Sequence, residues 1–340
     1  MLNRKIIFTK PLTAELVDTT FDESAPLTGS KALVKTLFTA VSAGTERDNL
    51  RGEPNLSCLN AQAVTRFPIQ LGYSGVGIVV AAGPDCRRVK PGDRVIVCFG
   101  THSEYNLMDE ASLYPVMEGF GDREAALAVI SCFPAEGVRK TRLEFGESAL
   151  IMGLGILGLF AVQIARAAGA SPVIAADPDP ERRELALKLG ASYALDPLDE
   201  GFVGKVTELC CGGADIAVDA VGNAAATSEA LACLKRFGRL TLVGCTRHHG
   251  EYDMYHLVHG KGVSIIGANN VARPVYESRP GNWTMGDDIA AMQKLSLDGR
   301  IDFGALISEV HSPTDAPSVY TRLGEGKKFP IGVLFDWSQL

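Results

Sequence analysis

The sequence lacks long apolar runs and cysteine pairs of the C-x-x-C type. Polar residues, glycine or proline interrupt every apolar run well short of the roughly 20 residues that cross a membrane, so no transmembrane helix is expected. The eight cysteines are scattered along the chain. This spacing argues against a cysteine-rich structural zinc site and against a disulfide framework, and we expect reduced, mostly buried thiols.

Excess positive charge is absent too. The chain has 33 Lys and Arg against 40 Asp and Glu, a net charge of −7, so a basic footprint for nucleic acid is missing. The N-terminus, MLNRKIIFTK, has neither a long apolar core nor a small-residue cleavage site, so we expect no secretory signal and a cytoplasmic protein. What is present is globular: 340 residues, 46% hydrophobic and 21% charged, which is enough for two domains.

The most informative stretch runs from Ala149 to Asp177. Apolar residues up to Met152 predict a buried strand, and the next six residues, GLGILG, fit Gly-x-Gly-x-x-Gly. A predicted helix then leads to a second apolar run that ends in Asp177. Strand, glycine turn, helix, strand and acid in this order predict a dinucleotide site.

The glycines have distinct roles in such a site. Gly153 permits the tight turn, Gly155 lets the backbone approach a pyrophosphate, and Gly158 lets the helix pack close to the strand. The N-terminus of the helix, at Ile156 and Leu157, then faces the phosphate charge.

Asp177 bears on the choice of cofactor. A carboxylate there can accept a hydrogen bond from the ribose 2′-hydroxyl and would repel a 2′-phosphate, which predicts NAD rather than NADP. Arg182 and Arg183 fall one turn into the next helix. Two interpretations of them stay open: surface charges, or contacts with the adenosine ribose that would accommodate NADP.

Strands and helices alternate from about 135 to 270, which predicts an α/β domain with a doubly wound parallel sheet. Ligands of such sheets bind beyond the carboxyl ends of the strands. The predicted strands are Ser148–Met152, Val173–Ala176, Ile216–Ala220, Leu240–Val243 and Val263–Gly267, and the predicted helices are Leu157–Ala168, Pro180–Leu189, Phe202–Cys210, Ala224–Lys235 and Tyr255–His259. Beyond the glycine turn, the predicted cofactor contacts are therefore Ala220, Val221, Gly222, Val243, Gly244, Gly267, Ala268 and Asn269.

The remaining chain reads as a second, β-rich domain. Short apolar runs alternate with turn residues up to about 134 and predict strands at Ala32–Leu37, Gly75–Ala82 and Arg94–Phe99. A helix is expected over Asp122–Val138, with a kink or break at Pro134. Residues 271–340 are too few to stand alone and are expected to return to this domain, with a helix at Asp287–Leu297 and a strand at Gly332–Phe335.

Motifs along nearly the whole chain resemble the medium-chain dehydrogenase/reductase superfamily. They are VSAGTERDN, LGYSGVGIVVAAG, VKPGDRV, HSEY, MGLGILG, AADPDPERRELALKLGA, DAVG and GRLTLVG. The resemblance implies a GroES-like catalytic domain, residues 1–134 completed by 271–340, and a Rossmann NAD-binding domain, residues 135–270. It also implies a small-molecule substrate and a homodimer or homotetramer.

The positions of the family's zinc ligands are changed. Ala43 stands where zinc enzymes of the family carry a cysteine, and Gly72-Tyr73-Ser74 stands in place of Gly-His-Glu. Only Cys132 resembles a remaining ligand, and a catalytic zinc needs three. SAGTE and GYSGVG are similar to a zinc-lacking branch with bacteriochlorophyllide dehydrogenase-like and sugar-cluster oxidoreductases, so we expect no metal. The open alternative is a zinc held by Cys132, His102 and Glu46.

Without zinc, side chains must handle the substrate proton. Thr45 matches the family's proton-relay hydroxyl and Asp48 an outer relay base. Tyr73, in a zinc ligand's place, is expected to point at the substrate, and His102, in a pocket-wall position, to act as acid or base. Structural alternatives remain: Thr45 bonds local backbone, Tyr73 fills the vacated volume, and His102 is a satisfied wall residue.

The segment from 267 to 283 carries the candidate substrate contacts. Asn270, Arg273 and Trp283 together suit a polyhydroxylated substrate, since amide and guanidinium groups bond hydroxyls and indole packs on a sugar's C–H face. The alternative is a dimer or domain-contact loop.

The predicted function is an NAD-dependent, zinc-independent oxidoreductase that interconverts a secondary alcohol and a ketone, on a polyol or sugar-like compound. Two alternatives stay open. A quinone or enoyl reductase needs little acid/base help, but such enzymes generally use NADPH, which Asp177 opposes. A nucleotide-binding sensor without turnover would also keep the fingerprint and lose the metal ligands.

Overall fold

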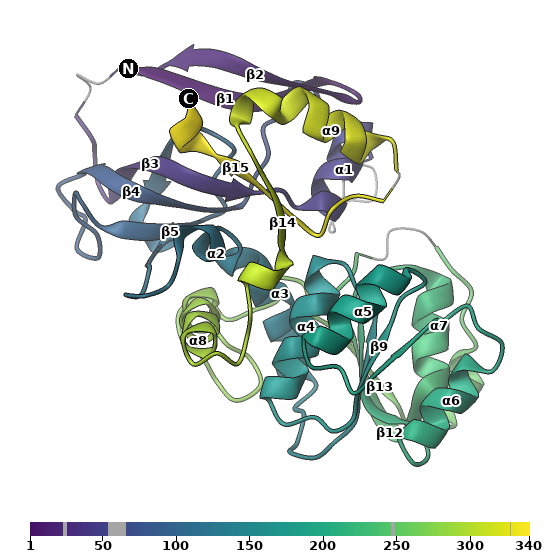
Figure 1. Ribbon diagram of the computed structural model, residues 1–340. Helices are drawn as coiled ribbons and strands as arrows, with labels where there is room; N and C mark the ends of the chain where they lie inside the picture. The colour runs from purple at the N-terminus through teal and green to yellow at the C-terminus, as the bar shows by residue number, and fades with distance from the viewer. Residues whose placement is uncertain (23–25, 54–65, 246–248, 327) are drawn as a thin grey trace. The chain divides into compact units, whose positions relative to one another are not determined.

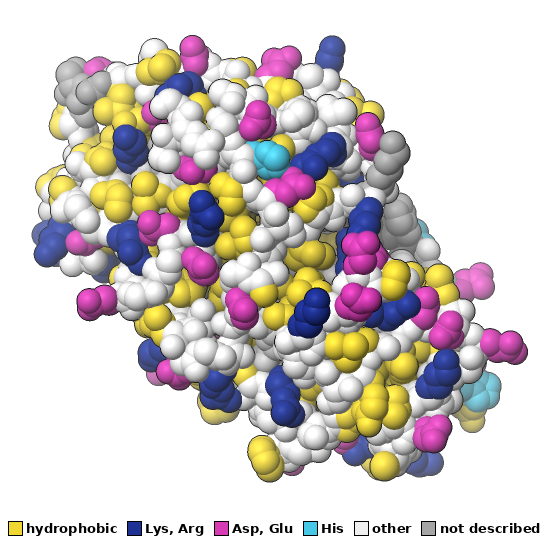
Figure 2. Space-filling view, in the orientation of Figure 1, with side chains coloured by type: hydrophobic (Ala, Val, Ile, Leu, Met, Phe, Trp, Pro, Cys, Tyr) yellow, Lys and Arg dark blue, Asp and Glu magenta, His cyan; other side chains and the backbone are white. Residues whose placement is uncertain are grey.

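The computed structural model describes residues 1–22, 26–53, 66–245, 249–326 and 328–340 (Figure 1). The chain forms two compact units. The first comprises Met1–Ile130 and Phe303–Leu340, and the second Ser131–Asp302. None of the helices in the described ranges is long and apolar enough to cross a membrane. On the face shown in Figure 2, acidic and basic side chains are interspersed, without a patch of one sign.

The first unit is built on a mixed sheet with the strand order β14-β15-β3-β4-β5-β7, with β6 pairing β3. A separate hairpin, β1–β2, packs against α9 (Figure 1). Ile6, Phe8, Leu50, Tyr320 and Phe335 are among the side chains buried between hairpin, helices and sheet. Its elements are β1 (Leu2–Lys10), β2 (Thr13–Thr20), β3 (Lys31–Ala40), α1 (Ala43–Arg51), β4 (Ser74–Ala82), β5 (Arg94–Cys98), β6 (Tyr105–Asp109), β7 (Leu113–Pro115), α2 (Asp122–Ala126), β14 (Ile307–His311), α9 (Ala316–Gly324) and β15 (Gly332–Asp336).

The second unit has a six-stranded parallel sheet in the order β10-β9-β8-β11-β12-β13. The strands β8, β9 and β11 are fully buried, as expected for a sheet covered on both faces. The predicted doubly wound α/β fold is confirmed. Its elements are α3 (Ala128–Lys140), β8 (Ala149–Met152), α4 (Ile156–Ala167), β9 (Val173–Ala176), α5 (Pro180–Lys188), β10 (Tyr193–Leu195), α6 (Phe202–Leu209), β11 (Ala214–Asp219), α7 (Ala224–Cys233), β12 (Leu234–Leu242), β13 (Ser264–Gly267) and α8 (Met285–Leu297).

The structure differs from the sequence predictions in three places. The helix expected over Asp122–Val138 breaks at Leu127, where α2 ends, while Pro134 lies inside α3. Tyr255–His259 forms a π-helical turn. Residues 271–302 belong to the second unit and the chain rejoins the first only at Phe303, because ion pairs bind this segment to α3.

Candidate functional site

The glycine turn joins β8 to α4 in the second unit. Gly153 has φ +84°, a conformation that favours glycine, and its N–H donates to the carbonyl of Ala176 at 2.8 Å. A side chain at Gly158 would overlap the carbonyl oxygen of Gly153, whereas the space beside Gly155 holds no atom within 4 Å. Because the first amides of α4 have no intrahelical partner, this open turn can receive an anion.

Asp177 follows β9 and is 6% exposed. Its two carboxylate oxygens accept from the backbone N–H groups of Leu154 and Asp179, each at 2.8 Å. Arg182 reaches the same carboxylate only at 3.8 Å, while Arg183 donates to the carbonyl of Asp177 at 2.7 Å. Asp177 thus ties the glycine turn to the start of α5, and Arg183 caps the same corner.

A buried aspartate that the sequence reasoning missed organises the neighbouring loop. Asp219 ends β11, is fully buried, and accepts from the N–H groups of Val221 and Gly222 at 2.8 and 3.0 Å. Its other oxygen accepts from the hydroxyl of Thr227 at 2.6 Å. A carboxylate directly after an apolar run, in DAVG, was the available signal. The loop is held so tightly that a side chain at Gly244 would approach the nitrogen of Gly222 to 2.7 Å.

The other predicted cofactor residues follow the same edge of the sheet. Lys140 fixes the last of these loops by donating to the carbonyls of Gly267 and Ala272 at 3.1 and 2.9 Å. Most of the predicted cofactor residues therefore lie at one edge of the sheet, beyond the carboxyl ends of β8, β11, β12 and β13. These residues are Gly153, Gly155, Ile156, Leu157, Gly158, Ala220, Val221, Gly222, Val243, Gly244, Gly267, Ala268 and Asn269.

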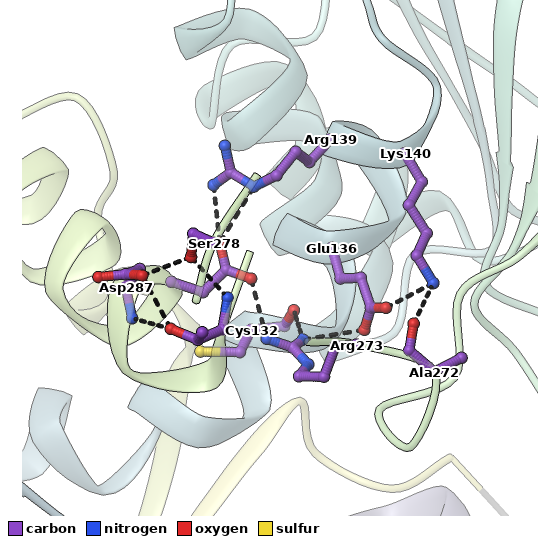
Figure 3. A network of polar contacts seen from close by, with 10 residues as sticks. Cys132, Glu136, Arg139, Lys140, Ala272, Arg273, Ser278 and Asp287 are labelled. Carbon is purple, nitrogen blue, oxygen red and sulfur yellow. Dashed lines mark hydrogen bonds and ion pairs between the residues drawn. The ribbon is translucent and has the colours of Figure 1, made fainter. Parts of the chain in front are cut away.

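Arg273 lies in a buried network of ion pairs (Figure 3). Its guanidinium donates to Asp288 at 3.0 Å, to Glu136 at 2.9 Å and to the carbonyl of Cys132 at 3.1 Å. Lys140 also pairs with Glu136, at 2.6 Å. With only 6% of its side chain exposed, Arg273 fastens the segment after β13 to α3.

The two other candidate substrate residues differ from each other. Trp283 lies under the guanidinium of Arg139, 3.5 Å from the ring centre, and Arg139 in turn donates to Asp288 at 2.7 Å. The indole face is thus occupied by a cation. In contrast, the buried amide nitrogen and oxygen of Asn270 have no hydrogen-bond partner among the described residues. Asn270 is thus the candidate whose whole amide group remains available, whereas Arg273 keeps only its Nε without a partner among the described residues.

Replacing Arg273 with methionine is expected to lower the free energy of unfolding by about 2–3 kcal/mol, because buried hydrogen bonds to two carboxylates are lost. Urea unfolding measures the change. Arg279→Met is the matched control: Arg279 is exposed on the same segment and its loss should cost within about 0.5 kcal/mol. Equal stability of the two variants would contradict the structural role of Arg273.

In the first unit, two hydroxyls meet at the N-terminus of α1. Ser42 Oγ lies 2.8 Å from Tyr73 Oη, and the half-buried Tyr73 ring also packs near Phe99, with 6.1 Å between ring centres. Thr45, one turn into α1, is half-buried, and its hydroxyl bonds to no other residue in the described part of the chain. Tyr73 and Thr45 therefore place two hydroxyl groups near the N-terminus of α1.

Behind this pair lies a buried polar cluster. His102 Nε2 is 3.2 Å from Glu46 Oε1, and His102 Nδ1 is 2.7 Å from the hydroxyl of Thr39. The hydroxyl of Tyr320 donates to Glu46 at 2.6 Å, and Trp337 donates to Thr39 at 2.9 Å. His102 and Glu46 are each only 1% exposed. Both nitrogens of the imidazole are thus bonded to protein groups. This arrangement supports the alternative in which His102 is a satisfied wall residue rather than an acid or base.

Burial and pairing set the ionisation of this cluster. Burial raises the pKa of the Glu46 carboxyl, but the charge and hydrogen bond of His102 and the hydrogen bonds from Tyr320 and Ser42 outweigh it and hold that pKa below its usual value. Burial, and then the charge of Glu46, raise the pKa of Tyr320 well above 10. Glu46 is therefore the anion of the cluster and Tyr320 its neutral donor.

Asp48, the predicted outer relay base, is 4% exposed on α1. The Nε of Arg47 lies 3.9 Å from the carboxylate of Asp48. Asp48 lies on the same helix as Thr45, but its carboxylate is buried. Its predicted role as an outer relay base therefore stays a prediction.

Comparison with protein families decides the chain's membership. Residues 32–141 match the alcohol dehydrogenase GroES-like domain, and residues 157–279 match the zinc-binding dehydrogenase domain. The chain belongs to the medium-chain dehydrogenase/reductase superfamily. As a member of this alcohol dehydrogenase-like superfamily, it is an oxidoreductase with a nicotinamide dinucleotide cofactor.

Relatives of this medium-chain dehydrogenase/reductase are named as dehydrogenases. L-threonine 3-dehydrogenase of Pyrococcus horikoshii is 27% identical over 86% of this chain and 88% of its own. D-guloside 3-dehydrogenase of Escherichia coli K12 is 26% identical over 94% and 95%. The structure of 2R,3R-butanediol dehydrogenase from Bacillus subtilis is 20% identical, covers 98% of this chain and 99% of its own, and has a TM-score of 0.82, which supports the same fold.

Within the described ranges, the side chains of this medium-chain dehydrogenase/reductase do not provide a donor set for a catalytic zinc. No group of three or more His, Cys, Asp or Glu side chains in the described ranges is placed to hold a metal ion. Glu46 and His102 are bonded to each other, and Cys132 is fully buried. Ala43 and Tyr73 offer no zinc-binding sulfur or imidazole at the two changed positions.

Proposed function

We propose that this protein is an NAD-dependent, zinc-independent oxidoreductase that interconverts a secondary alcohol and a ketone on a polyol or sugar-like substrate. The observation that carries the proposal is the Tyr73–Ser42 hydroxyl pair. By its resemblance to the family's Gly-His-Glu motif, Tyr73 replaces a zinc ligand. A phenol can polarise a carbonyl by hydrogen bonding, a task that a metal ion performs in zinc enzymes.

In this proposal, a bound nicotinamide cofactor would supply or accept the hydride. Tyr73 exchanges the proton with the substrate oxygen: it donates the proton during ketone reduction and receives it during alcohol oxidation. Thr45 offers a second hydroxyl from the first turn of α1. Glu46 and His102 hold the N-terminus of α1 from behind, since Glu46 accepts from the backbone N–H of Ser42 at 2.9 Å.

The proposed cofactor contacts use the glycine turn for the pyrophosphate. The N–H groups at the start of α4 would face its charge, and the open space at Gly155 would admit it. Asp177 would face the adenosine ribose and disfavour a 2′-phosphate, and Arg182, held only at 3.8 Å, would flank it.

Asp177→Asn should therefore narrow the preference for NADH over NADPH by at least about tenfold, because it removes a like-charge repulsion while the amide retains one acceptor oxygen. Dissociation constants for both nucleotides, from protein fluorescence titration, measure the ratio. Asp179→Asn is the control, since Asp179 caps α5 next to the same turn. An unchanged ratio in Asp177→Asn would remove Asp177 from cofactor selection.

The polyol or sugar-like substrate rests on two supports. The relatives include a D-guloside 3-dehydrogenase. In this chain, Asn270 presents a buried amide whose donor and acceptor are unsatisfied within the described residues, and such a group suits a ligand hydroxyl. Arg273 and Trp283 would support this loop rather than touch the substrate. Arg273 is bound by Asp288 and Glu136, and the ring of Trp283 is stacked against Arg139.

The experiment that tests the function is NADH formation from NAD and a panel of polyols, sugars and secondary alcohols, with a strong chelator present. We expect turnover that survives the chelator. Turnover abolished by chelator and restored by zinc would contradict the metal-free mechanism. Tight NADH binding without turnover of any alcohol would instead favour a quinone or enoyl reductase, to be tested with NADPH, or a nucleotide sensor.

We also propose a homo-oligomer that assembles through the edge of the second unit's sheet. β13 pairs only with β12 among the described strands, and its Ile265 is partly exposed. Val275 and Tyr276, in the segment that follows, are strongly exposed apolar side chains. Light scattering after size-exclusion chromatography tests the assembly. Seven described cysteines without disulfides suit the proposed cytoplasmic location.

A further inference from the structure

Ser42 occupies an N-cap position without acting as an N-cap. It precedes α1, yet its side chain makes no capping hydrogen bond to the helix. A serine there usually accepts a backbone N–H and stabilises the helix by about 1 kcal/mol. The hydroxyl of Ser42 is instead directed to Tyr73 Oη at 2.8 Å. Ser42 therefore does not stabilise α1 as an N-cap. Its hydroxyl instead contacts a side chain that lies 31 residues away in the sequence.

The backbone of Ser42 is fixed independently of its side chain. Its N–H donates to the carboxylate of Glu46 at 2.9 Å, and its carbonyl accepts from the N–H of Glu46 at 2.8 Å. Glu46 is itself held by His102 and Tyr320. Ser42 is 9% exposed, and its backbone is held in place. Among the described residues, its hydroxyl has one side-chain partner at hydrogen-bond distance, Tyr73.

We propose that Ser42 is a positioning residue for Tyr73, which orients the phenol and donates a hydrogen bond to its oxygen whenever the phenol has lost its proton. The reaction in which this matters rests on the proposed function. In ketone reduction, the O–H bond of Tyr73 breaks, a new O–H bond forms on the substrate, and the phenolate oxygen then accepts from Ser42 Oγ. Ser42 itself neither gains nor loses a proton.

The pairing can be tested without a substrate. In protein labelled with ¹³C at the Cζ of tyrosine, the resonance missing from Tyr73→Phe identifies Tyr73. In Ser42→Ala, the titration midpoint of this resonance should move up by about one pH unit, the size of one hydrogen bond to a charged group. Ser42→Thr, which keeps a hydroxyl, should restore the wild-type midpoint. Ser103→Ala, which removes a buried hydroxyl bonded to Gln70 and Thr101, should leave it unchanged.

A midpoint that does not move in Ser42→Ala, in a variant that melts like wild type, would overturn the proposal. This measurement needs no turnover, so it tests the pairing of Ser42 with Tyr73 independently of the proposed reaction. The proposed reaction is tested by the panel of substrates assayed with a chelator present. With a turned-over substrate, Ser42→Ala should lower kcat by about 10- to 100-fold and leave KM within about twofold, as expected for a group acting only on the proton step. A change in KM alone would assign Ser42 to substrate binding and contradict the positioning role.

Discussion

Tyr73→Phe is expected to lower kcat by about 10²- to 10⁴-fold, the range that a positioned acid/base group contributes. The substitution removes one oxygen and keeps the ring that packs near Phe99. It also frees Ser42 Oγ, which lies at the same contact. In the proposed mechanism the phenol is the group that exchanges the proton with the substrate oxygen, so its removal should slow this step most.

The measurement is steady-state kinetics on the best substrate of the panel, with chelator present and NADH binding followed separately. NADH affinity should stay within about twofold, because Tyr73 makes none of the contacts proposed for the pyrophosphate and the adenosine ribose. Tyr105→Phe is the matched control: it removes a tyrosine hydroxyl in the same unit, from a ring that packs on Phe21. A loss of less than about fivefold in Tyr73→Phe would show that the phenol only fills the volume of the missing ligand.

The nucleotide-binding elements could be predicted because their signal is local. Gly153, Gly155 and Gly158 have conformational and packing roles that adjacent residues determine, and the flanking apolar runs define the strands. The doubly wound sheet followed from the same alternation and is confirmed. Elements at the chain ends, such as β1, β2 and α9, were missed because their partners are distant: the Phe8 ring contacts Tyr320.

The roles of single polar residues could not be predicted from spacing. His102 has the same chemistry whether it faces a substrate or Glu46, and the pairing spans 56 positions of the sequence. From the sequence, Arg273 could bind either a sugar hydroxyl or a carboxylate of the protein. Its carboxylate partners lie on α3 and α8, far from it in the sequence. The same ion pairs explain why residues 271–302 join the second unit.

Removing the carboxylate of the buried cluster is expected to have the largest effect on stability. Glu46→Ala should lower the free energy of unfolding by about 3–5 kcal/mol, because it leaves buried partners without their acceptor. These are the ring of His102, the hydroxyl of Tyr320 and the N–H of Ser42. Urea unfolding measures the loss. Glu104→Ala, which breaks a more exposed ion pair with Arg4, should cost at most about 1 kcal/mol.

The pH dependence of this loss has a defined sign. The pKa of Glu46 is lower in the folded protein than its ordinary value of 4.5, so its contribution is fully present above that value and disappears as the pH falls through the folded pKa. The difference in stability between wild type and Glu46→Ala should therefore shrink in acid below about pH 4.5. At the other end, the raised pKa of Tyr320 gives a contribution that is present below pH 10 and is lost as the pH rises further. A stability difference that stays constant through the acid range would mean that Glu46 is not the anion that holds α1, and the fixed backbone of Ser42 would then need another explanation.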